Sequence, residues 1–525
     1  MSQAFPADMD QVAEIVGASE KILADSHINK KLLDEYRLLI EEIVLKLIEN
    51  SKPGSEITVT RVKRIGGVNI KIGCPGTPIV LGEQDEMDIG GRIIEEYSDY
   101  LRQSYSSGTN YITFTTSYDS TLLLSVGSLV LSVVVALLLG LFFDGTQIEW
   151  INDNLIYPCV IIFTRALQTM ALPAAFFSLA SFLVTLNLSL DKDLRIKRLF
   201  FRYFGTSLVA IGVGAICWAV YRAFGFLTYD LTAFSVAREN FMGQSVQEFL
   251  TQTVSSNIID PFIVTNPLPM LIIAVLLGFG AASFFGPEGD TTRKAISSIN
   301  GLFCRALNIV YSSIPIFLFF ALLTKWLSAG AGYALVLLSY FGMLILPLVL
   351  MFVVYAIQMI LSGVNPITFV KDYAEVILEN LRIGSNIQAL PYNKRMIYRK
   401  TKMQSGLLRE GLNLGTLMNM DGNCMIISTT ILVLLTCTGV QLSVVQVISM
   451  LFIIILLSVG APNQPGSFQL SMIVLMAYVG ISGDLYGDIL IIEAFTGKLY
   501  SCVNALGDIV TMVMESHRLK KSNAN

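Results

Sequence analysis

Residues 411–436 read GLNLGTLMNMDGNCMIISTTILVLLT, and this stretch decides how the chain folds. It is long and apolar enough to cross a bilayer as a helix, which takes about 20 mostly apolar residues. Yet Asn419, Asp421 and Gly422 stand in its middle. A glycine beside an ionisable group inside a span indicates local unwinding, which is tolerated only where protein or water surrounds the backbone. The sequence therefore predicts a broken membrane helix with a polar site at the break.

Other polar residues lie in the same apolar third of the chain, among them Glu493, Lys498, Asn504 and Asp508. Unwound carbonyls together with carboxylate and amide oxygens suit a hard cation such as Na+, which prefers oxygen ligands. The alternative is a polar network that only holds helices together. The concentration of ionisable groups within residues 421–508 favours an ion site.

The composition divides the chain into two parts. Of the 525 residues, 53% are hydrophobic and only 14% are charged, against about 25% charged in soluble domains. The charges concentrate in residues 1–110, so a soluble head precedes a membrane body. A net charge of −4 gives no support for a nucleic-acid partner, and the seven cysteines show no metal-binding spacing. The N-terminus lacks the pattern of a signal peptide, so we expect the head in the cytosol.

The membrane body contains eight segments long and apolar enough to cross a bilayer. They lie at about 120–143, 155–187, 199–226, 258–285, 296–327, 331–361, 411–436 and 485–514. Two further apolar regions, 366–402 and 443–482, are interrupted by Gly, Pro, Asn and Gln, and we interpret them as re-entrant helical hairpins. The predicted fold is thus a mainly α-helical polytopic membrane protein of eight transmembrane helices plus two re-entrant hairpins, with a small N-terminal α+β cytosolic domain.

Basic residues in the loops agree with this layout. They follow the second span, precede the seventh and fill the tail: Lys192, Arg195, Lys197, Arg198, Arg202; Lys394, Arg395, Arg399, Lys400, Lys402; Arg518, Lys520, Lys521. The loop after the first span is acidic, with Asp144, Glu149 and Asp153. By the positive-inside rule both termini are cytosolic, and we expect the plasma (inner) membrane. The expected parts are a leader helix in 1–29, the α+β domain in 30–117, the membrane domain in 118–515 and a tail in 516–525.

Several motifs in this order resemble those of the dicarboxylate/amino acid:cation symporter family, the glutamate-transporter-like proteins. Residues 419–422 (NMDG) resemble the motif of the seventh span, and 503–508 (VNALGD) that of the last. Residues 384–391 (GSNIQALP) and 458–466 (SVGAPNQPG) are similar to the tips of the two hairpins. The resemblance covers about residues 119–515. It implies a homotrimer in which each subunit moves a transport domain across the membrane like an elevator.

The resemblance also implies cation ligands. One set maps to Gly415, Asn419, Asn504 and Asp508, and a second to Tyr203, Thr206, Ser207, Asn419 and Asp421, all of the family's residue types. A third, made mainly of carbonyls, maps to Leu417, Ser458, Val459 and Ala461. No other cofactor is implied. Both Na+ and H+ stay open as the coupling ion, since a carboxylate such as Glu493 can carry a proton.

The solute site departs from the family. The implied positions are Ser385, Asn386, Asn423, Pro462, Asn463, Gly497, Tyr500 and Asn504. Gly497 stands where amino-acid members have an Asp for the substrate ammonium, and Tyr500 where acidic-substrate members have an Arg. Losing both partners disfavours aspartate, glutamate and C4-dicarboxylates, because an unpaired charge is costly in a desolvated pocket. Lys498 either meets an anion or pairs with Glu493.

The head is predicted to contain a helix at 31–51, strands at 57–62 and 68–72, a helix at about 90–105 and a strand at 110–116. A helix at 8–24 is an unassigned leader. This order resembles a degenerate ATPase domain of the histidine-kinase/anti-sigma-factor class, with Glu42 retained and residues 90–93 at a later glycine-rich helix start. Lys46 and Cys74 replace the family's Mg2+-binding Asn and adenine-binding Asp. We therefore expect a site for a cytosolic regulator rather than a nucleotide.

Two functions follow from these observations. The first is a cation-coupled symporter, with Na+ as the expected cation, that carries a small organic solute and is not an enzyme. The second is a membrane sensor that does not transport and signals through the head. An ATP-driven pump is disfavoured because no GxxxxGK[ST] sequence occurs.

Overall fold

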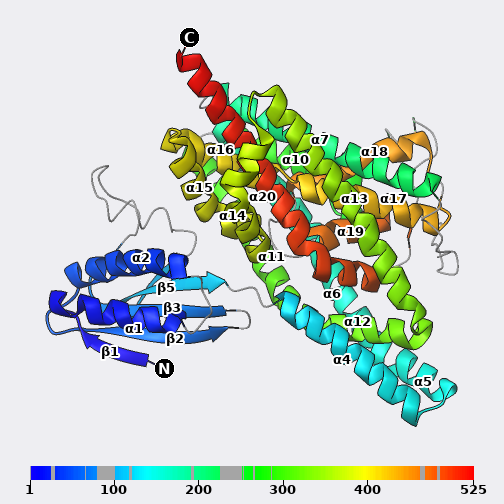
Figure 1. The fold of residues 1–525 in the computed structure, drawn as a ribbon, viewed down its shortest axis with the longest axis horizontal. Helices are drawn as coiled ribbons and strands as arrows, with labels where there is room; N and C mark the ends of the chain where they lie inside the picture. Colours follow the sequence, from blue (N-terminus) through cyan, green and yellow to red (C-terminus); the bar gives the residue numbers. More distant parts are fainter. Residues whose placement is uncertain are drawn as a thin grey trace. The chain divides into compact units, whose positions relative to one another are not determined.

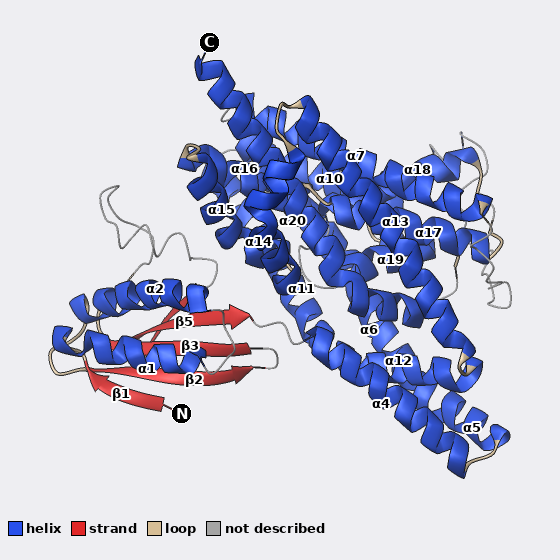
Figure 2. Ribbon diagram, in the orientation of Figure 1, coloured by secondary structure: helices blue, strands red, loops and turns tan. Residues whose placement is uncertain are grey.

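The structure is a computed structural model of the chain. It describes residues 2–24, 30–64, 67–79, 101–117, 121–190, 194–224, 247, 251, 253–263, 267–284, 286–440, 442–460, 467–481 and 485–524. The chain divides into two compact units, Met1–Thr121 and Leu122–Asn525. The first unit is α+β and the second is helical, as Figure 2 shows by colour.

The first unit is an antiparallel sheet covered on one face by helices (Figure 2). Its elements are β1 (Ser2–Pro6), the 3-10 turn η1 (Met9–Gln11), α1 (Val12–Ala24), α2 (Lys30–Glu49), β2 (Glu56–Arg64), β3 (Gly67–Pro75), β4 (Leu101–Ser106) and β5 (Thr109–Ser117). The strand order is β1-β2-β3-β5-β4. Alternation of apolar residues along β2, β3 and β5 sends Val59, Ile72 and Phe114 into a core shared with Ile40 and Ile43 of α2.

Two expectations for the head need correction. Residues 101–106 form strand β4, whereas a helix was predicted at 90–105; residues 90–100 lie outside the described residues. The turn explains the strand: Ser107 and Gly108 both have positive φ, which suits a two-residue hairpin between β4 and β5. The N-terminal helix is also not a separate leader, because Ile15 and Leu23 of α1 lie in the core of this unit.

The second unit begins with helices that match the first predicted spans. They are α4 (Thr121–Phe142), α5 (Gly145–Ile151), the π-helical turn η3 (Asn152–Ile156), α6 (Tyr157–Leu190), α7 (Leu194–Ala223), α9 (Asp260–Ile263), α10 (Pro267–Ser283), α11 (Gly286–Ser312), α12 (Ile314–Ala329) and α13 (Gly332–Leu361). Helices α11 and α12 meet at a bend of 52°. The predicted span at 258–285 is α9 followed by α10, and α10 is a short apolar helix.

The remaining helices are arranged as two pairs, one broken helix and a long last helix. They are α14 (Pro366–Ile383), α15 (Asn386–Thr401), α16 (Ser405–Met418), α17 (Asp421–Cys437), α18 (Val444–Gly460), α19 (Ser467–Tyr478) and α20 (Tyr486–Ala524). Helix α20 packs against α14, α15, α16, α17 and α19, as can be followed in Figure 1. By length and composition, six described helices could cross a membrane, or seven if the bent pair α11–α12 is one span.

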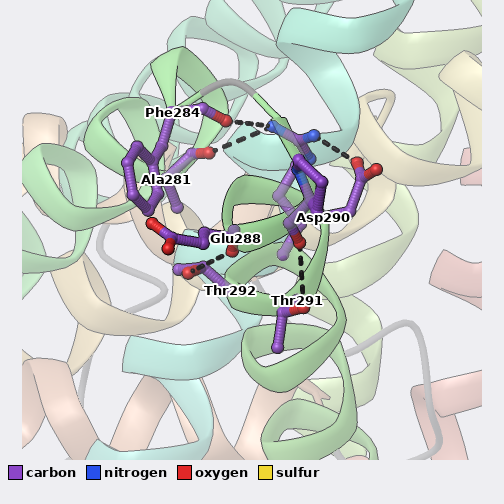
Figure 3. A network of polar contacts seen from close by, with 8 residues as sticks. Ala281, Phe284, Glu288, Asp290, Thr291 and Thr292 are labelled. Atoms are coloured by element: carbon purple, nitrogen blue, oxygen red, sulfur yellow. Dashed lines mark hydrogen bonds and ion pairs between the residues drawn. The ribbon is translucent and has the colours of Figure 1, made fainter.

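At the turn between α10 and α11, the free carbonyl groups at the end of α10 find hydrogen-bond donors on α11 (Figure 3). The Arg293 guanidinium donates to the carbonyls of Ala281 and Phe284 and forms an ion pair with Asp290. Thr291 and Thr292 donate to carbonyls one turn back in α11. The last carbonyls of a helix have no partner within the helix, so Arg293 supplies one from the next helix.

Helices α6 and α10 cross at close range at Gly278. A Cβ atom there would lie 2.9 Å from Leu183 Cβ and 3.0 Å from the Ala180 carbonyl oxygen, whereas Gly280 on the same helix faces open space. We predict that Gly278→Ala lowers the free energy of unfolding by about 1–3 kcal/mol through overpacking. Gly280→Ala, the matched control, should be neutral or stabilising by about 0.5–1 kcal/mol because alanine is the better helix former.

The thermal midpoint of the purified protein in detergent measures both effects. Equal midpoints for the two variants would contradict the close crossing of α6 and α10.

Candidate cation and solute site

The predicted break in the helix lies between α16 and α17. Asn419 has φ −83° and ψ 83°, and Met420 has φ −105° and ψ 44°, so neither is helical. The unwinding is therefore confirmed, but it precedes Gly422, which lies inside α17. The break frees backbone polar groups in the middle of an apolar segment, and these groups need partners from elsewhere.

Glycines let α20 come close enough to supply those partners. A Cβ on Gly422 would lie 2.1 Å from the Tyr500 carbonyl oxygen. A Cβ on Gly507 would lie 2.3 Å from Asn419 Nδ2. Gly422 therefore lets the backbones of α17 and α20 approach closely, and Gly507 leaves room for the polar side chains of Asn419, Asp421 and Tyr355. The consequence is that Asn504, between Tyr500 and Gly507 on α20, reaches the break.

Asn419 and Asn504 link the broken helix to α20 through hydrogen bonds. Asn419 Nδ2 donates to the Asn504 carbonyl at 3.2 Å, and Asn504 Oδ1 accepts from the Gly422 amide at 2.7 Å and the Asn423 amide at 3.4 Å. Two free N–H groups in the first turn of α17 are thus satisfied by a side chain of α20. All of these groups are buried.

The structure brings the predicted α7 residues onto the same break. Ser207 Oγ donates to Asp421 Oδ1 at 3.1 Å, and Thr206 Oγ1 donates to Asn419 Oδ1 at 3.2 Å. Tyr203, fully buried, donates to the Gly411 carbonyl of α16 at 3.1 Å. Four residues of the second predicted cation set thus meet at the break, and the fifth, Tyr203, lies beside Gly415, where a Cβ would be 2.9 Å from its Cζ.

The first predicted set meets at Asp508. This side chain is 1% exposed, and a Cβ on Gly415 would lie 2.5 Å from its Oδ1. Among the described residues, Asp508 Oδ1 has no hydrogen-bond partner. A buried carboxylate oxygen without a partner beside the unwound end of α16 fits a cation better than it fits a closed protein network. Gly415, Asn419, Asn504 and Asp508 are the residues that would hold it.

The rest of the predicted cation ligands are only partly described. Ser458 and Val459 are buried at the end of α18, and Leu417 is half-buried on α16. Ala461, Pro462 and Asn463 lie outside the described residues.

On the solute side, the structure joins Asn423 to the second helical pair. Its amide donates to Ser467 Oγ of α19 at 3.0 Å, and its Oδ1 accepts from Asn504 at 3.3 Å. Ser385 and Asn386 are both buried at the junction of α14 and α15. Asn386 Nδ2 donates to Asp508 Oδ2 at 3.2 Å, so it contacts the predicted cation set.

Gly497 and Tyr500 lie together on α20 with Glu493. The Tyr500 hydroxyl donates to Glu493 Oε1, and the Tyr500 ring lies 5.9 Å from that of Phe468, centroid to centroid. A Cβ on Gly497 would lie 3.3 Å from Glu493 Oε1, an approach that glycine leaves open. Tyr500, at the position where the resemblance has an Arg, therefore contacts the Glu493 carboxyl group one to two turns earlier on the same helix. Lys498 donates to the Arg382 carbonyl at 3.2 Å.

Two site residues were missed by the sequence analysis. Tyr355 of α13 donates to Asp421 Oδ2 at 2.7 Å and also contacts the Val503 carbonyl at 3.2 Å. Ser467 of α19 accepts from Asn423. A tyrosine within the apolar run of α13 was the available signal for Tyr355, but aromatic residues in spans are common and only the fold shows its direction.

In the head, residues 77–79 follow Cys74, the position that corresponds to the adenine-binding Asp of the resemblance, and they are hydrogen-bonded to other residues of the head. The Asn110 side chain accepts from the Ile79 amide at 3.2 Å and donates to the Thr77 carbonyl at 2.6 Å. The Thr77 amide donates to the Asn50 carbonyl at 3.0 Å. Burial raises the pKa of the Cys74 thiol, so this residue is neutral at pH 7 and offers no anion to an adenine amine.

Comparison with known proteins decides the family of the membrane body. The sequence profile of the sodium:dicarboxylate symporter family matches residues 129–517. The chain belongs to this family. It is a family of cation-coupled membrane transporters rather than of enzymes, and its matched region contains every predicted site residue.

Two relatives illustrate the range of sodium:dicarboxylate symporters. A C4-dicarboxylate transport protein of Edwardsiella ictaluri is 24% identical over 410 residues, 75% of this chain and 92% of the relative. A putative sodium-dependent excitatory amino acid transporter of Caenorhabditis elegans is 26% identical over 260 residues, 48% of this chain. That match spans only 51% of the worm protein.

We predict that Tyr355→Phe weakens Na+ binding by about 10–100-fold, because a partner that orients a ligand carboxylate is worth about that much in metal affinity. The measurement is the Na+ concentration that gives half of the thermal stabilisation of the purified protein. Tyr333→Phe is the matched control, since Tyr333 on the same helix donates to Asp488 at 2.8 Å outside the cluster. Equal Na+ dependence in both variants would show that Tyr355 has no part in the site.

Proposed function

We propose that the protein is a Na+-coupled symporter of a small organic solute that works by an elevator-type movement. The observation that carries the proposal is the pair of oxygen clusters around Asp421 and Asp508, which share Asn419. Both carboxylates are buried, at 0% and 1% exposure. Two such groups are costly without positive charge, and hard cations bind oxygen ligands of this kind.

The family's transmembrane arrangement is proposed for this chain as well. In it, α9–α10, α11–α12 and α16–α17 each count as one of eight spans, and α14–α15 and α18–α19 are the re-entrant hairpins. Both termini are then cytosolic, in the plasma (inner) membrane, and the assembly is a homotrimer. The loop charges and the broken helices support this layout.

The solute is proposed to be less acidic than those of the named relatives. Tyr500 and Glu493 offer a hydrogen-bonded phenol and carboxyl group where a guanidinium would recognise an anionic side chain. Gly497 supplies no carboxylate for an ammonium group. A monocarboxylate or a neutral polar metabolite fits these groups better than aspartate, glutamate or a C4-dicarboxylate.

We predict that Na+, but not K+, raises the thermal midpoint of the purified protein, and that one metabolite from a library raises it further only with Na+. A ligand at 100 times its Kd stabilises the folded state by about 2.7 kcal/mol. Asp508→Asn should abolish the Na+ response, whereas Asp488→Asn, on the same helix but paired with Lys325, should retain it.

A Na+ response absent at every concentration would contradict the proposal and favour coupling to H+. Na+-dependent uptake of aspartate at micromolar affinity would contradict the proposed solute class.

The second candidate function is a sensor that signals through the head without transport. Two features favour it. The solute site has Gly497 and Tyr500 in place of the family's charged residues, and the chain carries a head, in which Asn110 holds the segment at Thr77. The proposed role of the head is to bind a cytosolic regulator. We expect a chain lacking residues 1–117 to keep Na+-dependent uptake of the identified metabolite in proteoliposomes. Uptake that is absent from the full chain as well would support the sensor instead.

A further inference from the structure

The junction of α14 and α15 is a tip held in a defined conformation. Helix α14 ends at Gly384, whose φ of 67° and ψ of 20° are left-handed, and its amide donates to the Asn380 carbonyl at 2.8 Å. Ser385 and Asn386 follow at once and are 8% and 6% exposed. A glycine in this conformation ends a helix without the steric penalty that other residues carry.

A pair of buried amides sets the register of the two helices behind this tip. Asn380 Nδ2 donates to Asn393 Oδ1 at 2.7 Å, and Asn393 Nδ2 donates back to Asn380 Oδ1 at 3.0 Å. Each side chain is 2% exposed. Sliding α14 against α15 would leave both amides buried without partners, at about 1–3 kcal/mol for each group. The position of Asn386 relative to α14 is therefore fixed.

Helix α20 holds the tip from the other side. The Lys498 side chain packs over Gly384, where a Cβ would lie 2.5 Å from Lys498 Cγ. Its ammonium donates to the Arg382 carbonyl at 3.2 Å, one of the last carbonyls of α14. A cation at the C-terminal end of a helix is favourable for both the free carbonyl and the helix dipole.

With the tip so held, Asn386 reaches the carboxylate of Asp508. Its amide donates to Oδ2 at 3.2 Å, while Oδ1, beside Gly415, has no hydrogen-bond partner among the described residues. The two oxygens of one carboxylate thus have different roles. Oδ2 is occupied by a side chain of the tip, and Oδ1 is directed toward the unwound end of α16.

We propose that Asn386 is a positioning residue for the cation site, and that it makes cation binding depend on the α14–α15 tip. The amide fixes the rotation of the Asp508 carboxylate, so that Oδ1 is directed to the cation. When the tip moves away, the carboxylate loses this orientation and the site weakens. By linkage, a bound cation then favours the tip in place to the same extent.

This inference rests on the proposed cation-coupled function, and it changes the role of one residue. The family resemblance assigns Asn386 to the solute, whereas its contact is with the predicted cation ligand Asp508. The Asn386 side chain is long enough for its amide to donate to the Asp508 carboxylate. Asn386 also borders the proposed solute site.

The test uses the full-length protein in detergent, with Na+ alone as the probe. Asn386→Leu keeps the size of the side chain and removes the donor, and we expect the half-saturating Na+ concentration to rise by about 10–100-fold. Asn386→Ser restores a shorter donor and should recover part of the affinity. Thr401→Val removes a buried hydroxyl from the same helix, far from the tip, and should leave the Na+ dependence unchanged.

The outcomes separate this inference from the function on which it rests. A wild-type protein without any Na+ response overturns both. A wild-type response with the same half-saturating Na+ concentration in Asn386→Leu overturns the positioning role alone, even where the thermal midpoint in K+ falls. Should Asn386→Leu fail to fold, Asn386→Ala gives the same reading, and an unchanged Na+ affinity there overturns the inference equally.

Discussion

A backbone inside a bilayer has no water to satisfy its polar groups, and the break at Asn419 and Met420 places such groups in an apolar segment. The backbone amides of Gly422 and Asn423, just after the break, donate to the Asn504 side chain of α20. The Asn419 side chain at the break accepts from Thr206 of α7 and donates to the Asn504 carbonyl. Gly422 and Gly507 make this possible because larger residues would keep α20 away. The packing of α7, α17 and α20 around one point follows from the need to satisfy this break.

The two buried carboxylates beside the break are treated differently by their surroundings. Asp421 has a donor on each oxygen, from Ser207 and from Tyr355. Asp508 accepts from Asn386 at Oδ2, whereas its Oδ1 has no hydrogen-bond partner among the described residues. Ionising two carboxyl groups in a desolvated interior is costly without positive charge, which is the physical reason that a cation suits the site.

The helical pairs α14–α15 and α18–α19 both contact this site through hydrogen bonds. Asn386 of α15 contacts the cation side through Asp508, and Ser467 of α19 contacts Asn423. Each contact joins a side chain at a helix pair to the broken helix or to α20, so the predicted cation residues, the predicted solute residues and the α14–α15 tip share a small set of hydrogen bonds. Reciprocal coupling between them is then a matter of linkage rather than of a separate signalling element.

Local sequence patterns were enough to predict many of the helices and strands. Apolar run length predicted α4, α6, α7, α13 and α20, alternation predicted β2, β3 and β5, and the polar residues at 419–422 predicted the break and the family. Local patterns failed at residues 101–106, where pairing with β5 outweighs helical spacing, and at α1, whose membership in the head core depends on contacts with distant strands. Three contacts could be known only from the folded chain: Tyr355 with Asp421, Gly422 with the backbone of α20, and Asn386 with Asp508. These contacts join residues far apart in the chain, and the direction of a side chain across a helix interface is set by the packing of both helices.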